Sequence, residues 1–285
     1  MMITQEIFES YCPAFRDPLG ETFNNVRPYL DAATAELHER FAPGAHLDDA
    51  KDAAEACVCY TAAYEAIPAL DLIATPNGFA VVNNQNLAPA SKERVAALRE
   101  SYRQSKSRYV SALIVLLTRF PDYELPAALS SLPLLPTASK CRDFGIYAKG
   151  VSFFGEEEYA KVRPQLVEAE HRLAGLISEE QVEHLRANQW IFENRTFRLD
   201  VTDLNTAEMP LLQLCREYLT AEVVSHMESV ETLWRGSLRT NAAVIIDYVT
   251  HHEYELPIYA ASSVAEANRT KPYENQANDP TFFFA

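Results

Sequence analysis

The sequence predicts a mainly α fold, with two tandem helical-bundle units, small β-hairpins and an extended C-terminal arm. Three observations predict it. Several segments repeat apolar residues every three or four positions, prolines mark their ends, and parts of the first half return in the second. Spacing of three and four gathers apolar side chains on one helix face, which then packs on a core. The units are expected at 1–136 and 137–261, and the arm at 262–285.

The composition is that of a folded, acidic protein. Of 285 residues, 48% are hydrophobic and 23% charged, enough for one large or two moderate cores. A net charge of -15 repels phosphate backbones, which disfavours specific nucleic-acid binding. We expect neither an export signal nor a membrane segment, because residues 1–11 lack a basic cluster and no apolar run approaches about 20 residues.

The first helix is predicted at 26–41, where apolar residues recur at helical spacing. Pro28 stands near its expected beginning, where the first-turn amides have no intrahelical partner in any case. Asn24 or Asn25 is expected to cap that end.

A second helix is predicted from about residue 48 to Ile67, where Pro68 is expected to stop it. Asn77 and Gly78 supply the positive dihedral angles of a tight turn, so a hairpin is predicted at 72–82. The longest periodic segment follows at 91–120 and predicts a helix of about 45 Å.

From 125 to 150 the periodicity disappears among prolines and small residues, which indicates a boundary between units. Gly145, Gly150 and Gly155 fit no phosphate-binding fingerprint, and we interpret them as flexible linker. The second unit is expected to contain a helix at 166–177, a capping box from Ser178, a hairpin at 190–199, and helices at 209–234 and 239–249.

Two short sequence segments of the first half occur again in the second half, in the same order. The tripeptide at 26–28 returns at 162–164, an offset of 136, and the tetrapeptide at 123–126 returns at 254–257, an offset of 131. Around the first segment, the apolar residues of the expected helix face recur at the same offset. We interpret this as an internal duplication.

One motif has the spacing of metal ligands. Glu168 and His171 form half of a di-iron site, which needs a second Glu-x-x-His and two more glutamates. At the 136 offset their counterparts are Ala32 and Ala35, so the second motif is missing. We interpret the pair as solvated helix surface.

Other chemically suggestive groups have plainer interpretations. His251 and His252 are adjacent and point in different directions, and Cys57 and Cys59 lie on different sides of one helix, as small core residues would. The acidic run 156–158 suits the positive end of a helix. We therefore predict no catalytic residue, no metal ligand and no cofactor, and so no enzyme.

The C-terminal arm is the expected interaction element. Residues 262–279 are polar without periodicity, yet aromatic side chains follow, and each is worth about 1.5–3 kcal/mol when buried. They can pack on their own subunit or on a neighbour. The interface candidates are Tyr273, Phe282, Phe283 and Phe284.

The stretch TPNGFAVVNNQNLAPASKERV at 75–95, with YCPAFRD at 11–17, resembles a family of structural proteins from Bacteroidetes phages and prophages. The resemblance is strongest over the first 125 residues. It implies a head-tail connector or adaptor, a helical protein that forms a homo-oligomeric ring beneath the portal. The implied partners are portal and tail or neck proteins, and the implied location is the virion, with the host cytoplasm during assembly.

Two other functions remain open from the residues alone. A helical metal-dependent enzyme of the di-iron type would hold stoichiometric metal. A monomeric helical binding scaffold would stay monomeric at high concentration and capture a peptide or small molecule.

Overall fold

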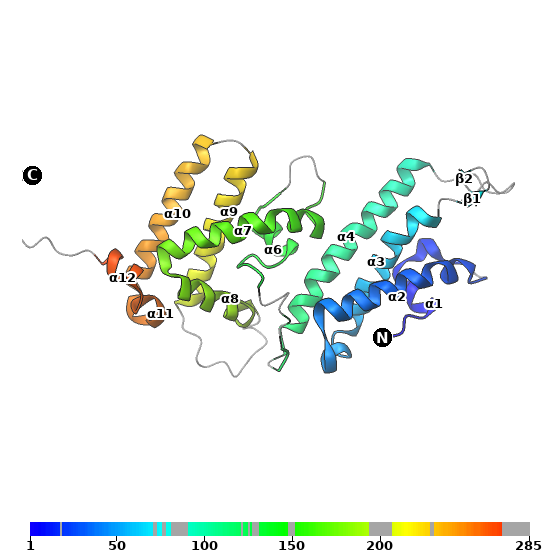
Figure 1. The fold of residues 1–285 in the computed structure, drawn as a ribbon, viewed down its shortest axis with the longest axis horizontal. Coiled ribbons are helices and arrows are strands. Elements are labelled where there is room, and N and C mark those ends of the chain that lie inside the picture. Colours follow the sequence, from blue (N-terminus) through cyan, green and yellow to red (C-terminus); the bar gives the residue numbers. More distant parts are fainter. Residues whose placement is uncertain are drawn as a thin grey trace, which may run out of the picture.

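The computed structural model describes residues 1–17, 19–70, 73–75, 78–80, 91–120, 122–124, 126, 131–147, 152–193, 207–228 and 231–269. The fold is mainly α, as predicted. Its helices form two groups that lie side by side along the long axis of the molecule (Figure 1). None of the helices within these ranges is long and apolar enough to cross a membrane.

The first group contains four α-helices, two short 3-10 turns and one strand pair. Helix α3 lies between α2 and α4, so it is buried on most of its circumference. The strands β1 and β2 pair antiparallel between α3 and α4, with Thr75 opposite Gly78. The bounds are α1 Gln5–Tyr11, η1 Pro13–Phe15, α2 Glu21–Phe41, η2 Gly44–Leu47, α3 Lys51–Leu70, β1 Ile73–Thr75, β2 Gly78–Ala80 and α4 Lys92–Leu117.

Helix α2 begins earlier than the sequence predicted. Gly20, in the left-handed conformation with φ 72°, is its N-cap, and Pro28 lies inside the helix. The prediction that Asn24 or Asn25 caps the helix was therefore wrong, since both residues are helical. Proline removes only its own amide from the hydrogen-bond ladder, and a helix that buries one face can tolerate that loss.

Helix α3 likewise continues past its predicted end. Pro68, expected to stop it at Ile67, lies inside the helix, which ends at Leu70. The φ of proline is already helical, so the last turn can form around it. Helix α4 is close to the prediction, with 26 residues or about 39 Å, and the Ser91 hydroxyl accepts a hydrogen bond from the Arg94 amide at its start.

The second group consists mainly of α7, α9 and α10, with shorter helices around them. Helix α7 packs on α9, and α9 packs along α10. Helix α6 falls within the stretch that lacked periodicity in the sequence, and Leu134 and Leu135 before it are fully buried. The bounds are α6 Ala138–Asp143, α7 Glu156–Ile177, α8 Glu179–Glu193, α9 Glu208–Glu228, α10 Glu231–His251, η4 Glu253–Glu255, α11 Pro257–Ala260 and α12 Ser263–Asn268.

Two elements of the second group differ from the predictions. The hairpin expected at 190–199 is wrong at its start, because α8 continues to Glu193, and residues 194–199 lie outside the described residues. The last two long helices are divided near 229–230, whereas the sequence suggested a break between 234 and 239. Gly236 lies inside α10, where a glycine costs only about 0.5–1 kcal/mol.

The C-terminal arm is also not extended throughout. Residues 263–268 form α12, the Ser262 hydroxyl accepts a hydrogen bond from the Ala265 amide at 3.1 Å, and Ala265 is buried. An N-capping serine and a single apolar anchor suffice for a short helix on an existing core. Residues 270–285 lie outside the described residues.

The residues that repeat at the offset of 136 occupy equivalent places in α2 and α7. Each helix contains an internal proline, Pro28 or Pro164, and buries one face. Every one of the five matched apolar pairs is buried in both helices. The pairs are Val26 with Val162, Leu30 with Leu166, Ala33 with Ala169, Leu37 with Leu173, and Phe41 with Ile177.

The two copies of the second segment, 123–126 and 254–257, lie in less similar environments. Tyr123 donates a hydrogen bond to the carbonyl oxygen of Phe41, whereas its counterpart Tyr254 is 84% exposed. Leu256 is fully buried, but its counterpart at 125 lies outside the described residues.

Candidate functional site

The acidic run at the start of α7 joins the two helix groups. Its three glutamates reach three different helices of the first group, so each contact crosses the junction. The contacts are Glu156 Oε2 with Arg40 Nη2 of α2 at 2.9 Å, Glu157 Oε1 with the Tyr64 hydroxyl of α3 at 3.1 Å, and Glu158 Oε2 with Arg103 Nη1 of α4 at 2.8 Å. We call these three glutamates and their partners the acidic clasp.

Glu158 also caps its own helix. Its carboxylate accepts the Gly155 amide at 2.8 Å, which satisfies an amide that the helix leaves open. Burial alone would raise the pKa of Glu158, but the Gly155 amide and Arg103 outweigh it and lower that pKa. The interpretation of the run as acids at a helix start is thus confirmed, while that of Gly155 as flexible linker was wrong, since it is the N-cap of α7.

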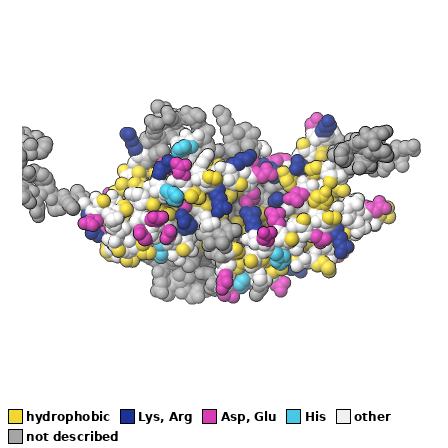
Figure 2. All heavy atoms as spheres, in the orientation of Figure 1, with side chains coloured by type: hydrophobic (Ala, Val, Ile, Leu, Met, Phe, Trp, Pro, Cys, Tyr) yellow, Lys and Arg dark blue, Asp and Glu magenta, His cyan; other side chains and the backbone are white. Residues whose placement is uncertain are grey.

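Beside the clasp, three arginines surround the ring of Phe153. The distances from the guanidinium carbons of Arg103, Arg108 and Arg142 to the ring centroid are 5.9, 5.6 and 4.4 Å. Burial lowers the pKa of Arg142, and the charge of Arg108 adds to this. Figure 2 shows basic and acidic side chains intermingled across the middle of the molecule. Three guanidinium groups therefore meet around one aromatic ring, beside the glutamates of the clasp.

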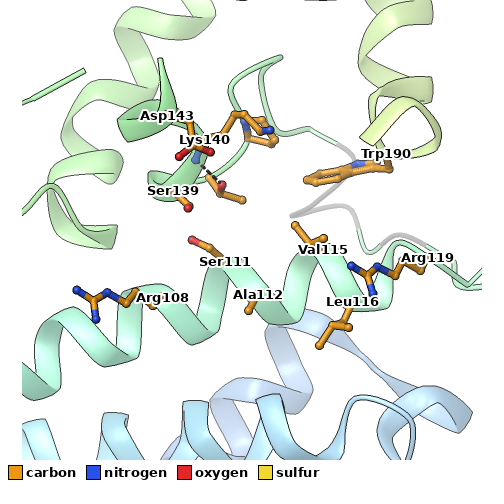
Figure 3. A pocket seen from close by; sticks show the side chains of 12 residues that line it. Arg108, Ser111, Ala112, Val115, Leu116, Arg119, Ser139, Lys140, Asp143 and Trp190 are labelled. Carbon is orange, nitrogen blue, oxygen red and sulfur yellow. Dashed lines mark hydrogen bonds between the residues drawn. The ribbon is translucent and has the colours of Figure 1, made fainter. Parts of the chain in front are cut away.

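A cleft of about 430 Å³ opens next to this cluster, between α4 and α6. Figure 3 shows Arg108 and Arg119 at opposite ends of the α4 wall, with Ser111 and Val115 pointing toward α6 and Trp190 of α8 closing one side. We call it the junction cleft. It is lined by Arg108, Ser111, Ala112, Val115, Leu116, Arg119, Pro136, Thr137, Ser139, Lys140, Asp143 and Trp190.

The Ser111 side chain is the unusual feature of this cleft. It is 97% buried, and within the described part of the chain its hydroxyl oxygen has no hydrogen-bond partner. A buried hydroxyl without a partner costs about 1–3 kcal/mol. A ligand that supplied a donor or an acceptor there would recover that free energy.

Behind the cleft, buried ionic side chains hold the segment that leads into α6. Glu170 Oε1 of α7 accepts the Leu134 amide at 2.5 Å, and its Oε2 pairs with Arg186 of α8 at 2.8 Å. Arg216 Nε of α9 donates to the Leu134 carbonyl at 2.7 Å. Burial raises the pKa of Glu170 despite the Leu134 amide and Arg186. Three helices thus fix the position of one wall of the cleft.

The structure does not bring the suspected metal ligands together. His171 is exposed on α7, and Glu168 pairs with Arg172 at 3.2 Å. His251 pairs with Asp247, while His252 stacks on Tyr248 with a centroid distance of 4.2 Å. Among the described residues, no three His, Cys, Asp or Glu side chains gather in a way that would hold a metal.

All five cysteines have free, buried thiols, which confirms the interpretation of Cys57 and Cys59 as core residues. Burial raises the pKa of Cys57 to about 12. A thiol with so high a pKa is a poor nucleophile at neutral pH. The predicted interface residues Tyr273, Phe282, Phe283 and Phe284 lie outside the described residues.

Sequence reasoning missed the junction cleft altogether. Arg108, Ser111 and Arg119 carry no motif, and they meet Lys140 and Trp190 only through the fold. One signal was present, because at the offset of 131 Arg108 is matched by a second arginine, Arg239. That repetition marked the position without showing its role.

Residues 15–130 match the model of a family of unknown function, DUF6712. The match covers most of the first helix group and less than half of the chain. No curated protein and no solved structure matches the chain.

Proposed function

We propose that this chain is a non-enzymatic structural protein of a phage virion, a head-tail connector or adaptor that forms a ring at the portal and neck. The observation that carries the proposal is the repeated helical unit, in which five matched apolar positions are buried in both α2 and α7. The resemblance of 11–17 and 75–95 to phage structural proteins supports the same role. Its partners would be copies of itself, the portal, and tail or neck proteins.

The duplication and the division into units at 1–136 and 137–261 are part of this proposal. The acidic clasp would then join two related units into one building block of the ring. A net charge of -15 would also keep a ring lumen from binding passing DNA. Such a protein would be made in the host cytoplasm and carried in the virion.

Native mass spectrometry and negative-stain electron microscopy of the full chain test this proposal. We expect one closed ring of defined stoichiometry, alone or after addition of the portal. A protein that stays monomeric over the whole accessible concentration range, with and without the portal, would overturn it.

A monomeric binding scaffold is the second candidate, and the junction cleft is the observation that favours it. Clefts of about 300–1,000 Å³ with apolar walls and few polar groups are typical ligand sites. A monomer that binds a peptide or a small molecule in this cleft would favour that function over a ring component.

A further inference from the structure

From the junction cleft we infer that it is the receptor for residues 279–284 of a neighbouring copy of this chain. The inference rests on the proposed function, because it requires assembly. It adds the place where the aromatic segment binds, and it makes the cleft an interface between copies.

The walls of the cleft suit aromatic side chains. Ala112, Val115 and Leu116 of α4 line the cleft, and Figure 3 shows Val115 pointing toward α6 with the Trp190 ring at its side. Burying an aromatic side chain there removes apolar surface from water, and offset contact with the indole ring adds a favourable aromatic interaction. Phe282, Phe283 and Phe284 are the longest aromatic run in the sequence.

The cleft also contains a polar group that lacks a partner. The Ser111 hydroxyl is buried and points from α4 toward α6, and no described residue satisfies it. The backbone of a docked peptide carries a carbonyl at every residue and an amide N–H at every residue except proline. A peptide is therefore a suitable partner for this hydroxyl.

The charges of the two surfaces are complementary. Arg108, Arg119 and Lys140 line the cleft with a single acid, Asp143, although the chain as a whole is strongly acidic. After Lys271 the sequence contains acidic residues but no basic one up to 285. Asp279 precedes the aromatic run by three positions, so it can meet the positively charged rim while the rings enter the cleft.

The dimensions agree as well. Arg108 lies nine positions, or about 14 Å, before Leu117 at the end of α4, and Arg119 follows two residues beyond that end. An extended chain from 279 to 284 covers about 17 Å. The segment therefore spans the cleft from one terminal arginine to the other.

The position of α12 indicates that the docked segment comes from a neighbouring copy. Helix α12, the last described helix, lies at the end of the second helix group that faces away from α4 (Figure 1). One wall of the cleft is α4 itself, at the opposite end of the second group from α12. We therefore assign the docked segment to a neighbouring copy in the proposed ring.

Disulfide trapping tests the contact directly. Ala112→Cys places an exposed thiol on the α4 wall of the cleft between two arginines, which favour the thiolate, and Phe283→Cys places one in the segment. The native thiols are all buried, so the new ones react selectively. We expect a mixture of the two single variants, as full chains, to form a covalent dimer on the order of 100-fold faster than random collision allows.

Ala35→Cys is the matched control, because it is also an exposed alanine on a helix of the first group but lies outside the cleft. Its mixture with Phe283→Cys should cross-link at the background rate. Equal rates for both mixtures, in protein that native mass spectrometry shows to be a ring, would overturn the receptor inference and leave the proposed function intact. A cross-link formed only within one chain of the double variant would overturn docking on a neighbour.

Charge reversal tests the rim. Asp279→Lys should slow the trapping about two- to five-fold, and high salt should remove the difference. Glu274→Lys makes the same change of charge five residues outside the docked segment, so it should leave the rate close to that of the parent pair. Equal slowing by both substitutions would contradict a specific contact of Asp279.

Discussion

Glu158 acts on both sides of the junction through one carboxylate. It accepts the Gly155 amide at the start of its own helix and binds Arg103 of α4, each at 2.8 Å. Both contacts require the ionised form, and both lower its pKa in the folded protein. The stability that Glu158 contributes is therefore linked to pH.

We predict that Glu158→Gln destabilises the protein by about 1–3 kcal/mol at neutral pH, because the charge-assisted bond to Arg103 is lost. The folded-state pKa lies below the ordinary value of 4.5. The contribution is thus fully present above pH 4.5 and is lost as the pH falls through the folded-state pKa. Thermal unfolding of both proteins from pH 7 to 3 should show their difference shrinking below about pH 4.5.

Glu168→Gln on the exposed face of the same helix is the control, and it should change stability by less than about 0.5 kcal/mol. A difference between wild type and Glu158→Gln that stays constant down to pH 3 would contradict this account.

Glu170 is a second glutamate whose replacement should change the stability of the protein. Because Glu170 is buried, pairs with the half-buried Arg186 and accepts the Leu134 amide, Glu170→Ala leaves a half-buried guanidinium and a buried amide without this partner. We expect a loss of about 3–5 kcal/mol in the free energy of unfolding. Glu170→Gln should lose less, since its amide oxygen can still accept the Leu134 amide.

Urea unfolding measures both changes, with Glu183→Ala on the exposed face of α8 as the control. Equal losses for Glu170→Ala and Glu170→Gln would show that the Leu134 amide does not depend on this acceptor.

At the scale of the element, the joint between α7 and α8 combines a cap with backbone strain. Ser178 ends α7 with φ 80° and ψ 154°, a conformation that is essentially restricted to glycine, and its hydroxyl accepts the Gln181 amide of α8 at 3.2 Å. Serine therefore gains a cap here at the expense of a strained backbone.

Ser178→Ala should keep the strain and lose the cap, which costs about 0.5–2 kcal/mol. Ser178→Gly should be close to neutral, because relief of the positive φ offsets the lost hydroxyl. Calorimetric unfolding of both variants measures which of them is the more stable. A glycine variant less stable than the alanine variant would show that this φ carries no strain.

The helices themselves were largely predictable, because the spacing of apolar residues along the sequence indicates which face of a helix is buried. The buried residues of α2 and α7 are those that recur at steps of three and four. The errors came from reading Pro28 and Pro68 as boundaries, since a long buried face outweighs one missing amide. Helix α12 was missed because one buried alanine, Ala265, leaves no periodic signal.

At the scale of the whole molecule, the candidate site was not predictable in the same way. The acidic clasp joins residues far apart in sequence, such as Arg40 and Glu156, and nothing in local spacing shows which arginine meets which glutamate. The sequence did show that 156–158 begins a helix. Only the packing of α7 against the first helix group gave that run its second role.

The clasp leads to a prediction about cooperativity. Replacing Glu156, Glu157 and Glu158 together by glutamine removes the charge from three polar contacts between the helix groups but leaves the apolar core, which runs through both groups, intact. The variant has weaker polar contacts across the junction, so the two groups should unfold with weaker coupling. We expect differential scanning calorimetry to show one transition for the wild type and two, or one clearly broadened transition, for the triple variant.

The control replaces Glu179, Glu180 and Glu183 of α8 by glutamine. It removes the same charge from an exposed helical surface, so it should shift the midpoint without broadening the transition. A single, equally sharp transition in both variants would mean that the packing of α4 against α6, rather than the clasp, couples the two groups. The wild-type transition is thus the reference that decides whether charge or apolar contact makes the two helix groups unfold as one unit.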